Sequence, residues 1–200
     1  MTQALVLASA SAGRLGVLRG AGIDPEVVVS GVDETCEDAL GTASLVELLA
    51  ERKAAAVATL RPGRLVLGCD SLLDFEGDAL GKAASPERAA AIWRRLAGHS
   101  GTLYTGHCLI HGGSGERARA VAATTVRFGC PTEAELAAYI ASGEPLSVAG
   151  GFSIDGLGAP FVDGIDGDAS NVIGLSLPLL RRLLAELGFA ITDLWRTRAS

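Results

Sequence analysis

The chain is poor in aromatic residues and has no excess of positive charge. Only 4 % of its 200 residues are aromatic, so alanine, leucine and valine must fill most of the interior. The formal net charge of -6 argues against a broad basic surface for duplex nucleic acid. A few cations in a cleft could still hold one phosphorylated small molecule, and no nucleic-acid polymer is expected as a partner.

Long apolar runs and a basic leader are also lacking. The longest apolar runs are far shorter than the roughly twenty residues that span a bilayer. The first residues, Met1-Thr2-Gln3, lack the basic start of a secretion signal. We therefore expect no membrane partner and a cytoplasmic location.

Paired metal-ligand motifs are missing as well. The four cysteines, at positions 36, 69, 108 and 130, show no Cys-x-x-Cys spacing, which favours reduced thiols over a disulfide framework or a zinc site. His99, His107 and His111 have no helical metal spacing, and we expect them to be structural.

What remains is an ordered globular chain. Its 200 residues, 48 % of them hydrophobic and 20 % charged, suit one domain or two small lobes that share a core. We predict a single domain over residues 1–200.

The stretch from residue 5 to residue 22 predicts a strand, a tight loop and a helix. The apolar run 5–8 ends at Ser9 and Ser11, and a helical pattern follows at once with Arg14 in its first turn. Backbone N–H groups and the helix dipole make such a junction suited to phosphate, although the serines could equally just turn the chain and cap the helix. It is not a P-loop, because no Gly-Lys-Ser/Thr follows a leading glycine.

A buried strand leads to the strongest single candidate for chemistry, Asp70. The uninterrupted apolar run 65–69 is typical of a strand covered on both faces, and it places Asp70 and Ser71 at its C-terminal end. Ligands of α/β sheets gather outside the carboxyl ends of strands. Asp70 could accept a proton from water, coordinate Mg²⁺ or cap the next turn. A hairpin around residues 76–78 is expected to return Lys82 towards it.

A long helix before this strand carries Lys53. The capping-box spacing of Ser44 and Glu47 predicts its start, and the segment 61–63, Arg-Pro-Gly, predicts its end. Lys53 would usually face solvent, but a helix packed along a cleft can point one lysine inward.

Two adjacent carboxylates, Asp33 and Glu34, follow a β-branched strand expected over residues 26–29. They could bind a divalent cation or could simply be solvated in a loop.

The rest of the chain predicts an extended sheet with further helices. A glycine-dense segment, 143–158, either brings backbone close to a ligand or is an irregular surface loop, and Asp155 is its polar side chain of interest. The segment 166–168, Asp-Gly-Asp, lacks the rest of a calcium loop and predicts a turn. Helices are expected from 85 to Gly98, from the capping box Thr132-x-x-Glu135 to Gly143 and over about 177–187, with paired strands over 102–110 and 117–128 and a short strand over 161–165.

Taken together, these motifs resemble the Maf family of nucleoside triphosphate pyrophosphatases, within the inosine-triphosphatase-like superfamily. No single motif is decisive, but the ordered set is specific and covers nearly the whole chain. The matching segments are 9–14, 33–34, 49–54, 68–71, 81–83, 139–145, 149–156 and 173–176.

The resemblance implies a fold, a reaction and a set of site residues. The fold is α/β, with an elongated mixed β-sheet flanked by helices and two lobes around a central cleft. The reaction is hydrolysis of nucleoside triphosphates, modified or non-standard ones included, to a monophosphate and pyrophosphate, a house-cleaning activity. Asp70 would be the proton acceptor and would share a divalent cation, Mg²⁺ or Mn²⁺, with Glu34. The substrate-binding residues would be Ser9, Ser11, Arg14, Lys53, Ser71, Lys82 and Asp155, and a homodimer is compatible with the family.

These residue types suit the chemistry. A triphosphate repels hydroxide until cations neutralise it, and water must lose a proton as it is directed at phosphorus.

The chain departs from the family where the base is thought to be read. The family's Pro-Arg-Arg is Ala12-Gly13-Arg14 here, its threonine is Ser71, and its late glutamine is Asp155. In the branch that prefers dTTP and UTP, these positions are implicated in substrate choice, so the resemblance assigns no base preference. An ionised carboxylate only accepts hydrogen bonds and would favour a base edge that presents N–H groups.

Two other functions compete with this interpretation. A non-catalytic regulator of septum formation would bind nucleotide without hydrolysing it, but the acids and lysines of the site are all retained. An aspartyl-phosphate phosphatase also places an aspartate after a buried strand, but it needs a second aspartate two residues later, where this chain has Leu72.

Overall fold

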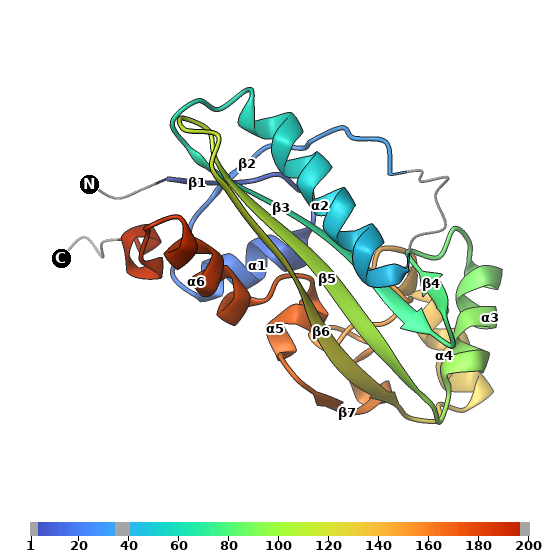
Figure 1. Cartoon of the computed structure of the whole chain (residues 1–200). Coiled ribbons are helices and arrows are strands. Elements are labelled where there is room, and N and C mark those ends of the chain that lie inside the picture. Colours follow the sequence, from blue (N-terminus) through green and yellow to red (C-terminus); the bar gives the residue numbers. More distant parts are fainter. Residues whose placement is uncertain (1–3, 35–40, 197–200) are drawn as a thin grey trace.

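The computed structural model describes residues 4–34 and 41–196, so the predicted free thiol of Cys36 lies outside the described residues. Figure 1 shows an elongated molecule built on one twisted sheet. The strands are β1 (Leu5–Leu7), β2 (Glu26–Val27), β3 (Leu65–Phe75), β4 (Asp78–Leu80), β5 (Ser100–His111), β6 (Arg117–Phe128) and β7 (Val162–Asp166). The α-helices are α1 (Ala12–Gly20), α2 (Thr42–Ala58), α3 (Pro86–Leu96), α4 (Glu133–Ala141), α5 (Ala169–Ile173) and α6 (Leu177–Glu186).

The sheet is mixed, as the sequence predicts. Its order is β2-β1-β3-β5-β6-β7, and β4 pairs with the distal end of β3. β1 is parallel to both of its neighbours, whereas each neighbouring pair along β3-β5-β6-β7 is antiparallel. The long hairpin of β5 and β6 therefore forms the backbone of the sheet.

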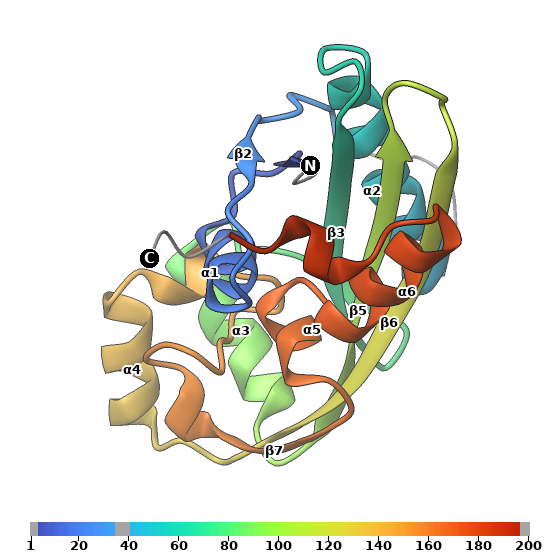
Figure 2. The same ribbon diagram turned by 90° about the vertical axis from the view of Figure 1, so that its left-hand side faces the viewer.

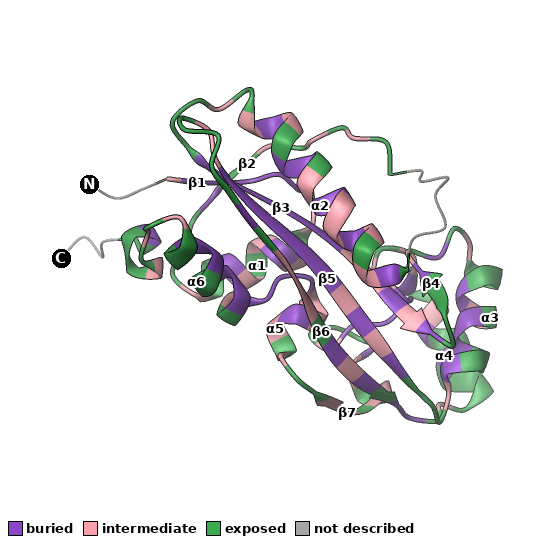
Figure 3. Cartoon of the chain, in the orientation of Figure 1, coloured by how far each residue is buried: buried purple, intermediate pink, exposed green. Residues whose placement is uncertain are grey.

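Helices cover both faces of the sheet, because successive side chains of a strand point to opposite faces and both sets are apolar here. Leu65 and Leu67 belong to an apolar cluster with α1 and α6, while Val66 packs with Val57 of α2. Figure 2 shows α1, α5 and α6 on the side of the sheet opposite α2. Most residues of the central strands β3 and β5 are accordingly buried (Figure 3).

The apolar interior has two large parts, which correspond to the two expected lobes. One joins β1 and the start of β3 to α1 and α6. The other lies at the opposite end, where Trp93 of α3 packs edge-to-face against Phe128 and Tyr139. The described helices include none with the length and apolar character needed to cross a membrane.

Most expected elements form where the sequence places them, and three differ. The strand predicted over 26–29 is only Glu26–Val27, because it is an exposed edge strand with one partner. The prediction of a capping box at Ser44 is wrong, because α2 begins at Thr42 after Gly41 and has no side-chain cap. The Thr42 hydroxyl instead donates to Asp74 Oδ2 at 2.5 Å. The capping box of Thr132 and Glu135 is present as predicted.

The third difference concerns Asp70, which was expected at the end of its strand. It lies in the middle of β3, because pairing with β5 continues unbroken from Leu65 to Asp74.

Candidate active site

A gap in strand pairing along one side of β3 surrounds the predicted catalytic residue. β1 pairs with β3 only as far as Leu67, and β4 pairs with it only from Leu73 onwards. Among the described strands, residues 68–72 of β3 thus have a neighbour on the β5 side alone. Asp70 and Ser71 lie in this gap and point to opposite faces of the strand.

Asp70 forms a buried ion pair with Lys53. The Lys53 Nζ lies 2.5 Å from Asp70 Oδ1 and 2.7 Å from Glu34 Oε1, so one ammonium holds both carboxylates. Lys53 points inward because α2 packs along the face of β3 to which Asp70 points. Of the two orientations that the sequence allowed for Lys53, towards solvent or inward, the inward one is therefore observed.

Burial changes the proton affinity of Asp70. Loss of solvent raises the pKa of this carboxyl above its ordinary value, and the charges of Lys53 and Arg14 oppose that rise. A carboxylate with a raised pKa and a nearby cation is a common feature of catalytic bases.

Arg14 occupies the other face of the gap. Its Nε donates to Gly174 O at 2.8 Å, and its two terminal nitrogens donate to Ser9 Oγ and Ser71 Oγ, each at 3.0 Å. These bonds use three of the five guanidinium N–H groups and leave one on each terminal nitrogen. Arg14 is thus fixed in place with a paired set of donors for an anion.

The loop before α1 has the geometry of an anion site. Ser11 caps the helix by accepting from Arg14 N at 3.3 Å, and its own N–H donates to Ser9 Oγ at 3.2 Å. The first N–H groups of the helix point towards the loop, next to the buried guanidinium. The sequence left capping and phosphate binding as alternatives, and the capping bond is present.

The carboxylates of Asp70 and Glu34 are suited to a divalent cation that also binds phosphate. Both accept from the Lys53 ammonium, so their oxygens already face one positive centre. Mg²⁺ commonly takes one or two carboxylates and completes its shell with water and substrate phosphates. Within the described residues, no group of three or more metal-ligating side chains forms a complete protein site. The donor set therefore fits a cation that arrives with a phosphorylated substrate.

The neighbouring thiol takes no part in nucleophilic chemistry at neutral pH. Cys69 is fully buried, and burial raises its pKa to about 12. Its role is packing, as expected for a reduced core cysteine.

Lys82 lies beyond the gap, on the side of the β3–β4 hairpin. Its backbone forms an isolated bridge with Ala149, and its exposed ammonium has no hydrogen bond or ion pair with the part of the chain that the structure describes. A meeting of Lys82 with Asp70 around a ligand remains a prediction.

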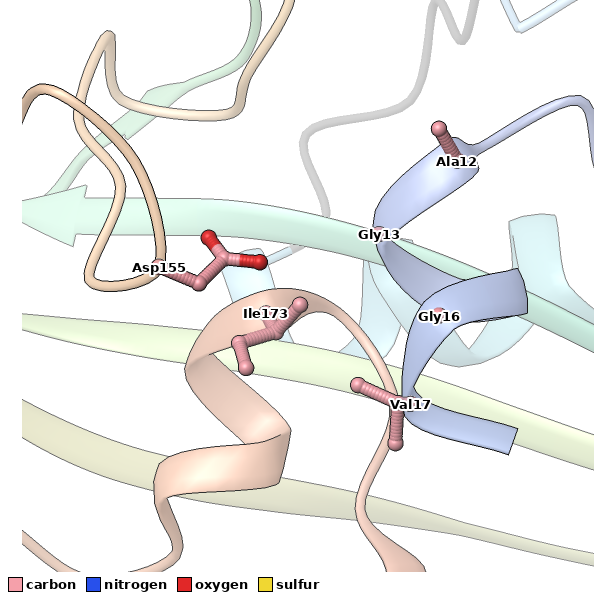
Figure 4. Close-up of a pocket in the computed structure, with 6 residues that line it drawn as sticks. All are labelled: Ala12, Gly13, Gly16, Val17, Asp155 and Ile173. Carbon is pink, nitrogen blue, oxygen red and sulfur yellow. The ribbon is translucent and has the colours of Figure 1, made fainter. Parts of the chain in front are cut away.

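Asp155 contributes to a pocket beside α1. The pocket has a volume of about 460 Å³ and is lined by Ala12, Gly13, Gly16, Val17, Asp155 and Ile173. Figure 4 shows the Asp155 carboxylate facing the gap between Ile173 and the first turns of α1. A Cβ at Gly13 would lie 3.1 Å from Ile173 O, so a side chain there would narrow the pocket.

Several supporting residues were not identified from the sequence. A buried polar chain runs from Ser71 through the Thr105 hydroxyl to Asn171 O, with oxygen distances of 2.9 and 3.3 Å. Asn171 is fully buried and also donates to Leu103 O at 3.2 Å. The strand that carries Thr105 also contains Thr102 and His107, so no pattern in the sequence marked this network.

Comparison with known proteins gives one consistent result. The family model described as Maf-like protein matches residues 4–187. A nucleoside triphosphate pyrophosphatase of Streptomyces coelicolor is 60 % identical over 194 residues, covering 96 % of this chain and 94 % of that protein. Its namesake in Streptomyces avermitilis is 57 % identical over 197 residues, covering 97 % and 95 %. One from Mycobacterium sp. strain JLS is 54 % identical over 208 residues, covering 98 % and 99 %.

Proposed function

Because the chain belongs to the Maf family and is a nucleoside triphosphate pyrophosphatase, we propose that Asp70 accepts the proton of the attacking water in its reaction. The observation that carries this proposal is the buried Asp70 carboxylate, held by Lys53 beside Arg14 at the gap in the sheet. The expected products are a nucleoside monophosphate and pyrophosphate.

Asp70 has one oxygen fixed and one available. Lys53 holds Oδ1 at 2.5 Å, while Oδ2 has no hydrogen-bond partner in the described part of the chain. Oδ2 can therefore take the proton as the water oxygen bonds to the α-phosphorus, and the electron pair of the broken bond leaves with pyrophosphate.

The phosphate chain is held by groups from both sides of the gap. Arg14 and the first turn of α1 bind it from one side, helped by Ser9, Ser11 and Ser71, and Lys53 and Lys82 bind it from the other. Asp70 and Glu34 would hold a divalent cation, Mg²⁺ or Mn²⁺, which would neutralise phosphate charge in the bound substrate. These fixed charges stabilise the pyrophosphate as its charge grows.

The nucleobase occupies the pocket between α1 and Asp155. The Asp155 carboxylate accepts hydrogen bonds and so favours bases whose edge presents N–H groups. Modified and non-standard nucleotides are included as substrates. We also propose a cytoplasmic enzyme that acts on free nucleotides as a homodimer; the net charge of -6 argues against a nucleic-acid polymer as substrate.

A product assay tests this function. The protein is incubated with Mg²⁺ and a panel of standard and modified nucleoside triphosphates, and pyrophosphate and orthophosphate are measured separately. Pyrophosphate and monophosphate in equal amounts support the proposal. Orthophosphate as the first product would indicate an aspartyl-phosphate phosphatase, and binding without turnover would indicate a non-catalytic regulator of septum formation.

A further inference from the structure

We propose that Glu144 is a positioning residue that fixes Asp155 at the base pocket and thereby sets the enzyme's choice among nucleobases. This inference rests on the proposed role of Asp155. Glu144 itself lies outside the pocket and acts through the loop that carries Asp155.

The loop is wrapped around the Glu144 carboxylate. Ser153 Oγ and Gly158 N donate to Oε1 at 2.6 and 3.0 Å, and Leu157 N donates to Oε2 at 2.9 Å. Tyr139 of α4 completes the set by donating its hydroxyl to Oε1 at 3.1 Å. The three loop donors lie two residues before Asp155 and two and three residues after it. One carboxylate thus holds both ends of the segment that presents Asp155.

Glycines allow this close approach. A Cβ at Gly156 would lie 2.5 Å from Glu144 Oε2, and a Cβ at Gly158 would lie 2.5 Å from the Tyr139 hydroxyl. Residues 152–158 form no regular helix or strand, so no ladder of backbone bonds fixes them. The carboxylate supplies the order that secondary structure does not.

The carboxylate is ionised at neutral pH. Partial burial raises the pKa of Glu144, but the bonds from Ser153, Leu157, Gly158 and Tyr139 outweigh burial and leave it below the ordinary value. A glutamine would keep the shape but turn an N–H group towards donors, which removes at least one of these bonds.

A second set of hydrogen bonds anchors the start of the loop near Lys82, the lysine proposed to bind phosphate. Gly150 N donates to Gly81 O at 3.0 Å, and Trp93 Nε1 donates to Gly151 O at 2.7 Å. These bonds hold residues 149–151 near Lys82 without Glu144. Loss of the carboxylate should therefore disturb base recognition and leave phosphate recognition in place.

Equilibrium binding separates the two effects. Two probes are titrated by calorimetry with Mg²⁺: α,β-methylene nucleoside triphosphates, which resist cleavage, and tripolyphosphate, which has no base. We expect Glu144→Gln to weaken binding of the preferred nucleotide analogue about tenfold, as loss of hydrogen bonds to a charged group implies. Binding of tripolyphosphate should weaken less than about twofold. Ser153→Ala removes a single bond and should give a smaller change in the same direction.

Glu133→Gln is the matched control, since Glu133 is an exposed residue of α4 that pairs with Arg94 on the surface. It should leave both dissociation constants unchanged. The inference is overturned if Glu144→Gln weakens both probes equally, or if neither changes in a variant whose thermal unfolding is cooperative. Should the wild type bind the analogues but release no pyrophosphate from nucleotides, the proposed reaction fails, and the ratio of dissociation constants still decides the role of Glu144.

Discussion

Two adjacent residues of β3, Asp70 and Ser71, contact the candidate site groups on opposite faces of one strand. Asp70 faces α2 and pairs with Lys53, whereas Ser71 faces α1 and accepts from Arg14. In a continuous sheet a neighbouring strand would separate these sides, but β1 ends before this point. A phosphate chain lying across the open edge can therefore contact both cations.

Asp70→Asn should lower the turnover number by about two to four orders of magnitude, because the amide cannot take the proton of water. Pyrophosphate release measures the effect, and a thermal melt confirms that the variant folds. Pyrophosphate release at the wild-type rate would show that another group is the base.

Asp155→Gln should change the relative kcat/KM values among nucleotides. Glutamine offers a donor as well as an acceptor, so bases that present an acceptor at this edge should gain relative to those that present N–H groups. The measurement is a panel of triphosphates, with Asp163→Gln, an exposed change on β7, as the control. Unchanged ratios across the panel would remove Asp155 from base recognition.

The sequence identified most of these side chains but not their exact setting. Asp70 was found because it follows an apolar run, although the strand continues beyond that run to Phe75. Glu144 belongs to a motif that supported the family resemblance, yet its role depends on a loop more than ten residues later. Contacts of that kind come from tertiary packing and leave no local pattern.

Among the secondary-structure elements, the start of helix α6 is held by a histidine of strand β5. His107 Nδ1 donates to Thr105 O at 3.0 Å, which leaves Nε2 to accept from Ser176 N, at the start of α6, at 2.8 Å. Burial lowers the pKa of His107 from 6.5 to about 4. The expected structural role of His107 is therefore seen directly, as a neutral imidazole that fixes a helix start.

This pKa shift predicts acid sensitivity. Between pH 6.5 and 4 the unfolded chain binds a proton at His107 and the folded chain does not, so stability falls as the pH falls through this range. From pH 7 to pH 5 the free energy of unfolding should drop by about 2 kcal/mol from this residue alone. Urea denaturation at the two pH values measures it.

His107→Gln should lose that part of the pH dependence, whereas the exposed His99→Gln should keep it. An identical pH dependence in all three proteins would contradict the assignment.

The packing of α2 on the sheet depends on two small residues. A Cβ at Gly68 would lie 2.2 Å from Ala50 O, and one at Gly106 would lie 2.1 Å from Val46 O. Gly68→Ala should therefore push α2 away from β3, destabilise the protein by about 1–3 kcal/mol and reduce kcat by displacing Lys53. Gly20→Ala, with open space around it in α1, serves as the control and should be neutral or slightly stabilising.

Chemical denaturation and pyrophosphate release measure both changes. Full activity and stability in Gly68→Ala would mean that the contact relaxes at no cost. The sequence predicted α2 and its buried partner strands, but the start at Thr42 was missed, because a tertiary bond to Asp74 replaced the local cap.

For the molecule as a whole, ligand binding should join the two lobes. Most of the proposed phosphate-binding groups come from α1, α2 and β3, while Asp155 and Lys82 belong to the part with α3 and α4. An α,β-methylene nucleotide with Mg²⁺, at about one hundred times its dissociation constant, should stabilise the fold by about 2.7 kcal/mol.

Removal of divalent cations with EDTA should abolish turnover and most of this stabilisation. The unfolding temperature and pyrophosphate release are measured before and after chelation, and after Mg²⁺ is added back. Unimpaired hydrolysis in EDTA would contradict the proposed role of Glu34 and Asp70 as metal ligands.

The central position of Asp70 in a strand that pairs continuously with β5 has a practical consequence. The proposed base Asp70 lies on a strand of the central sheet, while Asp155 lies on an irregular segment that is bonded to the Glu144 carboxylate. Recognition can thus be exchanged as a module. Grafting residues 12–17 and 152–158 from one family member onto another, together with the matching glutamate, should retarget hydrolysis to a different nucleotide without rebuilding the hydrolytic centre.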